Sequence, residues 1–499
     1  MLHYAHMATA FDYNSYIKKQ TSQILDRLKK FSKLYLEFGG KLFDDNHAAR
    51  VLPGFDPSGK IKLLQSLKDK AEVIICVNAH DIQKNKIRAD LGITYDLDAM
   101  RLIDNFRSRG ILVNSVVVTQ YLGQPAADVF KKRLGQRGET VYCFKSISGY
   151  PTNIDLIVSE EGYGANPYIE TSRPVVVVTG PGPGSGKLAC ALSQMYHDYR
   201  QNKKTGFAKF ETFPVWSLPL SHPVNLAYEA ATADLGDYNA IDPFHLEAYG
   251  DIAINYNRDI EVFPIVKNIL TKIMGREGVY QSPTDMGVNM VGDFIVDEDA
   301  IKDAAKQEIV RRFFKTGCDY REARVEKTAL ERIEILMKKL SLVPNDGLAV
   351  LPALKKSQEC GASAVAIVLK DGRVVTGKST DVLAASASAV LNCAKVLAGI
   401  PDDIHLISPN IIKPMLDLKE KVLNEDKKLL GLESALNALS ICAATDSMAV
   451  KCLKKLLELR GCVAHSSHIL PKNDAVALRK LGIEVTSSPE FESADLYIS

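Results

Sequence analysis

The first part of the chain alternates short apolar runs, rich in β-branched residues, with single amphipathic patterns, and this alternation constrains the fold most. Such runs are typical of buried strands, and the spacing between them is that of helices with one apolar face. Parallel strands need a crossover connection, usually a helix, so the pattern predicts βαβ units and an α/β fold with a largely parallel sheet. The predicted strands are LYLEF (34–38), EVIICVNA (72–79), ILVNSVVVTQ (111–120), TVYCF (140–144) and RPVVVVTG (173–180), and the predicted helices are 14–31, 60–70, 96–110, 125–138 and 187–201.

The 499 residues are enough for more than one domain at about 100–200 residues each. Helical periodicity over 301–342 predicts two helices separated near Gly317-Cys318, and the breakers Pro344, Asn345 and Gly347 follow. Beyond them, Asp371-Gly372 is a hairpin signal between SAVAIVL and RVVTG, and helices alternate with the runs IHLIS, GCVAHSS and EVTSS. We therefore predict α/β structure over 1–300, a helical connector over 301–343 and a C-terminal α/β domain with a mixed sheet over 344–499.

Composition and charge exclude several classes of protein. With 46% hydrophobic and 24% charged residues, the chain is neither disordered, nor collagen-like, nor a long coiled coil. The charge sum is 62 − 60 = +2 and no basic block occurs, so a nucleic-acid partner is not expected.

Three further features predict a cytoplasmic protein with no membrane partner. The nine cysteines are odd in number and widely spaced, with no CxxC, which is typical of reduced thiols. The first residues lack a basic segment followed by an apolar run, so no signal peptide is expected. The longest apolar stretch, 432–453, is interrupted by charged residues and predicts a buried helix instead of a membrane span.

A Gly/Pro-rich loop between the RPVVVVTG run and a helix predicts a phosphate site. Glycines let backbone N–H groups turn towards an anion, and the helix start and a lysine add positive charge. The loop is P-loop-like but departs from the nucleotide pattern, because Pro181 replaces its first glycine and Leu188 replaces the magnesium-binding Ser/Thr. The alternative is a tight turn with an exposed lysine. The predicted phosphate-binding residues are Gly180, Gly182, Gly184, Ser185, Gly186 and Lys187.

The stretch 37–50 follows another predicted strand and mixes cations with carboxylates. Sites in α/β proteins form at strand ends, and an arginine can hold a phosphate or carboxylate with two parallel bonds. Asp44 and Asp45 offer oxygens to a magnesium ion or a hydroxyl. A solvated loop with ordinary ion pairs is the alternative. The predicted ligand-binding residues here are Lys41, His47 and Arg50.

A third stretch, 222–247, places histidines beside carboxylates and contains the predicted catalytic residues. Histidine with a carboxylate neighbour is suited to general acid–base catalysis. No HxH or HExxH spacing occurs, so no metal site is predicted, and structural hydrogen bonding is the alternative. The residues are His222, Glu229, Asp242 and His245. In the last domain, His465 and His468 follow a predicted strand, and their role is left open.

Several long motifs, in order, resemble one family over nearly the whole chain. They are YLEFGGKLFDDNHAARVLPGFDPSGKIKLL, GYGANPYIETSRPVVVVTGPGPGSGKLA, FETFPVWSLPLSHPVNLAYEAATADLGD, IDPFHLEAYG, INYNRD and SPTDMGVNMVG. On these the chain resembles the largely bacterial family DUF1846, also called UPF0371. The resemblance implies a soluble α/β-rich protein with a helical insert and a C-terminal part of cytidine-deaminase-like topology, and it implies no reaction. It implies no zinc either, because residues 384–387 read Ala-Ala-Ser-Ala where a deaminase has His/Cys-x-Glu, and no PCxxC follows.

Together these features favour an enzyme that acts on a phosphorylated small molecule or a nucleotide. The phosphate would lie on the Gly180–Lys187 loop, with Lys187, Lys41 and Arg50 neutralising its charge. The cofactor is unknown: a nucleotide or phosphorylated metabolite fits, and magnesium is left open. The alternative, which Leu188 favours, is a non-catalytic ligand-binding or assembly component that retains an enzyme-like fold. Substrate, reaction, and assembly into a homo-oligomer or larger complex are also left open.

Overall fold

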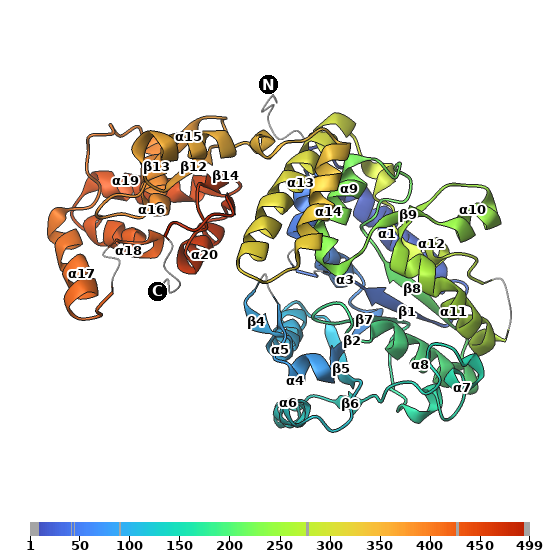
Figure 1. Ribbon diagram of the computed structural model, residues 1–499. Coiled ribbons are helices and arrows are strands. Elements are labelled where there is room, and N and C mark those ends of the chain that lie inside the picture. Colours follow the sequence, from blue (N-terminus) through green and yellow to red (C-terminus); the bar gives the residue numbers. More distant parts are fainter. Residues whose placement is uncertain are drawn as a thin grey trace. The chain divides into compact units, whose positions relative to one another are not determined.

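Seven parallel strands form the main sheet, in the order β11-β8-β1-β7-β2-β5-β6 (Figure 1). The computed structural model describes residues 9–40, 42–43, 45–88, 91–275, 279–425 and 429–493. The predicted α/β fold with a parallel sheet is confirmed, and all five strands predicted in the first part of the chain belong to it. The strands of this sheet are β1 (Lys33–Phe38), β2 (Ala71–Asn78), β5 (Leu112–Thr119), β6 (Val141–Cys143), β7 (Val175–Thr179), β8 (Thr205–Phe210) and β11 (Gly287–Val288).

The sequence pattern did not predict β8 and β11, which extend the sheet beyond β1. β8 reads TGFAKF, and a glycine and a lysine weaken its strand signal. The glycine, Gly206, is explained by packing: a Cβ there would lie 2.4 Å from the Phe31 ring. β11 has only two residues, too few for a periodic pattern. Two short hairpins complete the β structure of this part, β3 (Ile87–Arg88) with β4 (Ile93–Thr94), and β9 (Asn239–Ile241) with β10 (Ile254–Tyr256).

Helices cover both faces of the sheet (Figure 1). On one face, α1, α3, α5 and α6 contribute buried side chains, and on the other α7, α8 and α11 do so. The helices from the start of the chain to α12 are α1 (Tyr13–Leu28), α2 (Asn46–Val51), α3 (Gly59–Ser66), α4 (Ala79–Gln83), α5 (Tyr95–Arg107), α6 (Pro125–Gln136), α7 (Ile154–Ile157), α8 (Lys187–Arg200), α9 (Pro223–Ala231), α10 (Pro243–Tyr249), α11 (Asn257–Met274) and α12 (Pro283–Met286). Short 3-10 helices lie at η1 (Tyr163–Ala165), η2 (Ala233–Leu235) and η3 (Gly292–Phe294).

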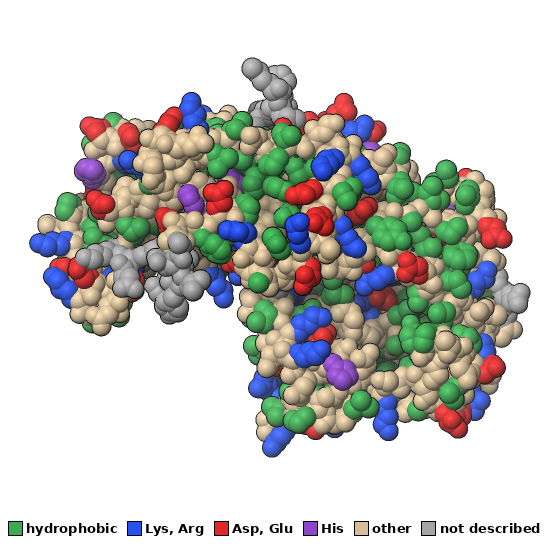
Figure 2. Space-filling model, viewed as in Figure 1, with side chains coloured by type: hydrophobic (Ala, Val, Ile, Leu, Met, Phe, Trp, Pro, Cys, Tyr) green, Lys and Arg blue, Asp and Glu red, His purple; other side chains and the backbone are tan. Residues whose placement is uncertain are grey.

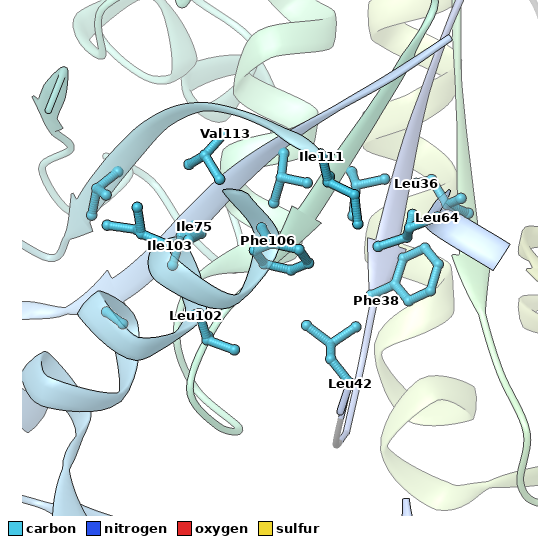
Figure 3. Close-up of a cluster of buried hydrophobic side chains, with 14 of the residues drawn as sticks. Leu36, Phe38, Leu42, Leu64, Ile75, Leu102, Ile103, Phe106, Ile111 and Val113 are labelled. Carbon is cyan, nitrogen blue, oxygen red and sulfur yellow. The ribbon is translucent and has the colours of Figure 1, made fainter. Parts of the chain in front are cut away.

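The core follows from side-chain alternation along the strands. In β1, Leu34, Leu36 and Phe38 point to the face covered by α1, α3 and α5, whereas Tyr35 points to the opposite face. Figure 3 shows the first of these layers, in which Phe106 of α5 is fully buried near β1 and β2. Each such side chain contributes roughly 1.5–3 kcal/mol through burial, so the two layers hold the sheet between its helices.

The contacts divide the chain into two compact units. The N-terminal unit comprises Thr9–Glu229 with Asp237–Lys302, and the C-terminal unit comprises Ala230–Gly236 with the residues from Asp303 onwards. The N-terminal unit contains the seven-stranded sheet and the candidate site described below.

The C-terminal unit contains a four-stranded mixed sheet in the order β13-β12-β14-β15. β12 is antiparallel to both of its neighbours, and β14 and β15 are parallel. The strands are β12 (Ala364–Val368), β13 (Val374–Lys378), β14 (Val463–Ser466) and β15 (Glu484–Ser487). The helices are α13 (Glu298–Arg321), which begins before the unit boundary, α14 (Lys327–Lys339), α15 (Val350–Cys360), α16 (Ala385–Ala398), α17 (Pro409–Lys421), α18 (Leu432–Cys442), α19 (Ser447–Lys455) and α20 (Lys472–Lys480), with 3-10 helices η4 (Pro344–Asp346) and η5 (Leu456–Leu459).

Two expectations for this part are corrected. The predicted break near Gly317 is wrong, because α13 continues to Arg321. A mid-helix glycine costs about 1 kcal/mol relative to alanine, and here Pro489 packs 3.4 Å from the position of a Gly317 Cβ. The IHLIS run forms no strand; its Leu406 and Ile407 are buried among helical side chains.

The face shown in Figure 2 carries basic and acidic side chains interspersed, as the small net charge of +2 suggests. Over the part of the chain that the structure describes, no helix combines the length and apolarity that crossing a bilayer requires.

Candidate functional site

The carboxyl ends of β1, β7 and β8 meet at one edge of the sheet, where α8 and α11 begin. β1 lies between β7 and β8, and Glu37 of β1 is the register partner of Lys209 of β8. Phe38 and Phe210 stack on the opposite face, with ring centroids 4.6 Å apart. Because side chains alternate along strands, Glu37 and Lys209 point to the face that α8 and α11 cover. Charged groups from two strand ends, β1 and β8, and from two helix starts are therefore brought together.

The Gly180–Lys187 loop connects β7 to α8, as the sequence predicted. Close contacts require glycine at three of its positions. A Cβ at Gly180 would lie 2.3 Å from a carbonyl oxygen of β2, and one at Gly182 would lie 2.3 Å from the Tyr95 hydroxyl. Gly186 has φ +82°, and its Cβ would lie 2.9 Å from the Thr119 side chain. The loop therefore packs closely on the neighbouring strand ends.

Two polar side chains at those strand ends hold the loop. Asn78, at the end of β2, donates from Nδ2 to the Gly184 carbonyl at 3.1 Å and caps α4 with its own Oδ1. Thr119, at the end of β5, donates to the Ser185 carbonyl at 2.8 Å. The Ser185 hydroxyl donates back to the Gly182 carbonyl. These bonds occupy the carbonyl oxygens of Gly182, Gly184 and Ser185.

Several loop and helix N–H groups donate no hydrogen bond. Within the described residues this holds for the N–H groups of Gly184, Gly186, Lys187, Leu188 and Ala189. The first N–H groups of a helix have no partner within it and are satisfied by a cap, water or a ligand. Gly186 is the N-cap residue and provides no side-chain cap. An anion is the ligand that such a group of donors favours.

Lys187, the first residue of α8, has an almost buried side chain that is 11% exposed. Its Nζ lies 3.5 Å from the Gly182 carbonyl oxygen and 3.9 Å from Glu37 Oε1. Both separations exceed the 2.7–2.9 Å that is typical of a charge-assisted hydrogen bond. The ammonium group is thus only loosely paired with these two oxygens.

A second polar cluster lies at the end of β8. Lys209 Nζ lies 3.1 Å from Glu211 Oε1 and also contacts Asp259 and the Tyr256 hydroxyl. That hydroxyl donates to Glu211 Oε1 at 3.4 Å. Although burial lowers the pKa of Lys209, Asp259, Tyr256 and Glu211 hold it well above its usual range. Lys209 is therefore a permanent cation, held mainly by Asp259 in the first turn of α11.

Among the described residues, only one of the two carboxylate oxygens of Glu211 has a hydrogen-bond partner. The residue is 6% exposed, and its Oε2 makes no hydrogen bond within the described part of the chain. Burial, together with the charges of Asp259 and Glu37, raises the pKa of Glu211 to about 7 against the opposing effect of Lys209. Near neutral pH this carboxyl both accepts and donates protons.

The predicted residues of the 37–50 stretch are placed around α2, after β1. Lys41 and Asp44 lie outside the described residues. Asp45 caps α2 and pairs with Lys60 at 3.0 Å. The His47 ring contacts Phe213, with centroids 5.1 Å apart, and Tyr228. Arg50 lies in the last turn of α2 and is half-buried.

The predicted catalytic residues of the 222–247 stretch do not form one group. His222 precedes α9, lies 3.7 Å from Glu298, and burial lowers its pKa. Asp242 is fully buried at the start of α10 and accepts from four groups there and at Thr284. His245 contacts Ser282 Oγ at 3.1 Å, and Glu229 accepts from the Asn239 N–H at 3.4 Å. The partners that the structure gives these side chains are internal, and their catalytic role stays a prediction.

In the C-terminal unit, His465 is fully buried on β14. Its Nδ1 lies 2.8 Å from Thr486 Oγ1 and its Nε2 3.1 Å from Ser488 Oγ. Burial lowers the pKa of His465 to about 4, so the ring is neutral. His468 Nδ1 lies 2.9 Å from Ser467 Oγ. Neither unit contains, among its described residues, a group of three His, Cys, Asp or Glu side chains arranged to hold a metal ion.

Sequence reasoning missed Lys209 and Glu211. The available signal was two charges, two residues apart, flanking Phe210 in an otherwise apolar run. Charged side chains are rarely buried unless paired, so their position in a strand was the clue. Because β8 was not predicted as a strand, there was no reason in the sequence to expect these two charged side chains to be buried.

Two family models cover nearly the whole chain. The model described as domain of unknown function DUF1846, N-terminal, matches residues 9–341, and the model of its C-terminal domain matches residues 345–497. The chain is 54% identical over 499 residues to a UPF0371 protein of Clostridium botulinum (strain Alaska E43 / Type E3), covering 98% of this chain and 99% of that protein. It is 53% identical to a UPF0371 protein of Clostridium tetani (strain Massachusetts / E88), with the same coverage. The motif resemblance is thereby confirmed, and the chain belongs to the DUF1846 family.

Proposed function

We propose that this chain is an enzyme that binds a phosphorylated small molecule or nucleotide through the Gly180–Lys187 loop. One observation carries the proposal: N–H groups without acceptors surround the first turn of α8, beside the loosely paired ammonium of Lys187. This is the set of donors that a phosphate needs. The strand–loop–helix setting supports a P-loop-like turn.

The energetics favour an anion at this place. A cation at a helix start is unfavourable by about 0.3–1 kcal/mol through the helix dipole, so stability alone does not explain Lys187. A phosphate oxygen at 2.7–2.9 Å would give it the close partner that Glu37, at 3.9 Å, does not provide. Such a charge-assisted contact contributes about 1.5–3 kcal/mol.

The pattern of residues also bears on the chemistry. Leu188 occupies the position of the usual magnesium-binding hydroxyl, so the loop itself provides no such ligand. Neutralisation of a phosphate would then fall to the protein's own cations, with Lys187 on the loop and Lys209 on β8. An acid–base group, Glu211, lies at the same sheet edge, which supports an enzyme.

Leu188 equally favours a second candidate, a ligand-binding or assembly component without catalysis. The C-terminal unit bears on this alternative. Its strand order, with β12 antiparallel to both neighbours, supports a cytidine-deaminase-like topology. Ala384–Ala387 occupies the start of α16 without a zinc ligand, so this unit would retain such a fold without its reaction.

Calorimetric titration of the full chain with inorganic phosphate, AMP, ATP and fructose 6-phosphate tests phosphate binding. Lys187→Ala should weaken the binding of whichever compounds bind by about ten- to a hundredfold. The free energy of unfolding without ligand should change by about 1 kcal/mol or less, because the lost contacts are long and the unfavourable interaction of the lysine with the helix dipole is removed. Lys204→Ala, an exposed lysine beyond the other end of α8, is the matched control. Equal affinities for Lys187→Ala and wild type, or no binding at all, would contradict the proposal.

Phosphorus NMR separates the enzyme from the alternative. A bound compound whose phosphorus signal is converted over time by wild type, and not by Lys187→Ala, supports catalysis. Binding that persists for hours with an unchanged spectrum favours the non-catalytic component.

A further inference from the structure

One arm of the N-terminal unit, residues 238–257, exposes a group of large apolar side chains. The arm consists of β9, α10 and β10, and a bond from the Asn257 N–H to the Tyr238 carbonyl oxygen, at 2.9 Å, closes its base. On the face shown in Figure 2, hydrophobic side chains gather over α10 and α12. Exposed apolar patches of this kind mark surfaces that bind another molecule. The large apolar side chains of the arm, between 42% and 64% exposed, are Tyr238, Ile241, Leu246, Tyr249 and Ile252.

The arm is fixed to its own unit on one side only. Asp242 accepts from Thr284 Oγ1 of α12 at 2.7 Å, and the Tyr249 hydroxyl donates to Asp285 at 2.8 Å. On the other side, residues 246–252 are all exposed, and α10 contains no buried residue. Leu246 and Tyr249 are three residues apart, so they lie on one face of the helix. The arm therefore projects beside α12 as a fixed element with an apolar face open to a partner (Figure 1).

The arm is also acidic. No lysine or arginine occurs between Lys209 and Arg258, whereas this stretch contains seven aspartates and glutamates. Two of them, Glu247 and Asp251, are exposed on the arm. If two arms packed against each other, these like charges would meet, which disfavours that contact. The surface that fits the arm is therefore apolar and basic.

An open groove between α1 and α3 has this complementary character. Its volume is about 710 Å³, and eleven residues line it. Ile17 and Leu25 form apolar walls that pack on the core behind them. The lysines of the lining are Lys18, Lys29 and Lys62, and its only carboxylate among the described residues is Asp26. A short helix with an apolar face and acidic neighbours fits such a groove.

The arm and the groove flank the same edge of the main sheet, at β11. From α1, Gln20 donates to the Val288 carbonyl oxygen at 2.6 Å, and Arg27 donates to that of Gly287. On the other side, α12, to which the arm is bonded, leads directly into β11. β11 is the outermost strand of the sheet. A two-fold axis near this edge would bring each arm to the groove of the other copy, and such a reciprocal contact closes on itself.

The size of the two surfaces is that of a stable dimer interface. Ten exposed residues of the arm and eleven residues of the groove give 21 residues per copy. A standard interface uses about 20–30 residues, or roughly 800 Å², on each partner. A single arm in a single groove would use about half of this, so the reciprocal arrangement is the one that reaches the required size.

We propose that the chain forms a two-fold homodimer in which the arm of each copy packs its Leu246–Ile252 face into the α1–α3 groove of the other. Glu247 and Asp251 then lie against the lysines of that groove. This inference does not depend on the phosphate loop, and it assigns the exposed apolar face of the arm to a second copy of the chain.

Sedimentation equilibrium of the full chain over the micromolar range tests the dimer. Wild type should have a mass of 2 × 54.9 = 109.8 kDa. The arm variant Glu247→Lys with Asp251→Lys, and the groove variant Lys18→Glu with Lys62→Glu, should each dimerise tenfold or more weakly, because like charges then meet at both contacts. An equimolar mixture of the two variants should form heterodimers more tightly than either variant forms homodimers. In the heterodimer one contact is native and the other has its charges exchanged.

The matched control is Lys131→Glu with Lys132→Glu, which reverses two exposed lysines of α6 outside both surfaces and should dimerise as wild type does. Thermal melting should show that every variant is folded, since all the changed side chains are exposed. A wild type that stays monomeric overturns the proposal. A dimer that is equally stable in both double variants, or a mixture that forms no heterodimer, also overturns it.

Discussion

Replacing Glu211 by glutamine should remove a pH dependence from the stability of the N-terminal unit. The pKa of Glu211 is raised from an ordinary 4.5 to about 7 by burial, Asp259 and Glu37. Between these values the folded chain binds more protons than the unfolded chain, so the free energy of unfolding falls as the pH rises. This loss of stability begins near pH 4.5 and is complete above pH 7. It is absent at lower pH, where Glu211 is protonated in both the folded and the unfolded chain.

The magnitude follows from the size of the shift. One pKa unit corresponds to 1.36 kcal/mol, so ionised Glu211 costs the folded state about 3 kcal/mol at pH 8. Glutamine has the same shape, stays neutral, and keeps an oxygen for Lys209 and Tyr256. Glu211→Gln should therefore be about 3 kcal/mol more stable than wild type at pH 8 and within about 1 kcal/mol of it at pH 4.5.

Urea unfolding from pH 4.5 to 8.5, followed by Trp216 fluorescence, measures this difference. Because the chain has one tryptophan and it belongs to the N-terminal unit, the signal reports on that unit. Glu261→Gln, which removes an exposed carboxylate of α11, is the matched control and should follow the wild-type profile with a constant offset. If wild type and Glu211→Gln show parallel stability profiles over the whole range, the Glu211 carboxyl does not have a raised pKa and the reasoning is refuted.

Two further predictions concern the loop and the C-terminal unit. Gly186→Ala and Gly184→Ala both place a side chain at positive φ, which costs about 1–2 kcal/mol. Only the Gly186→Ala side chain also meets Thr119, so the Tm of this variant should fall further. Equal losses of Tm in the two variants would contradict the close contact. Burial lowers the pKa of His465 from 6.5 to about 4, so between these pH values the folded chain binds fewer protons than the unfolded chain. Stability is therefore lost as the pH falls from 6.5 to 4, by up to about 3 kcal/mol. Hydrogen-exchange protection of β14 should drop over that range in wild type but not in His465→Asn, and an identical drop in both would contradict it.

Elements with a local periodicity could be predicted from the residues alone. The β-branched runs and the amphipathic helices between them predicted β1, β2, β5, β6 and β7 and hence the parallel sheet. The Gly/Pro loop was placed correctly between β7 and α8, because strand, turn and helix signals are read from adjacent residues. The hairpin signal at Asp371-Gly372 likewise marked the turn between β12 and β13.

Features that depend on residues far apart in the chain emerge only from the packing of the folded protein. Gly206 fits a strand only because the Phe31 ring takes the place of its side chain, and Gly182 is set by Tyr95. The IHLIS run is apolar enough for a strand, yet Leu406 and Ile407 pack among helices instead. The raised pKa of Glu211 depends on burial and on Asp259 in another element. Local sequence encodes backbone preference, whereas desolvation and side-chain contact exist only once distant segments have packed together.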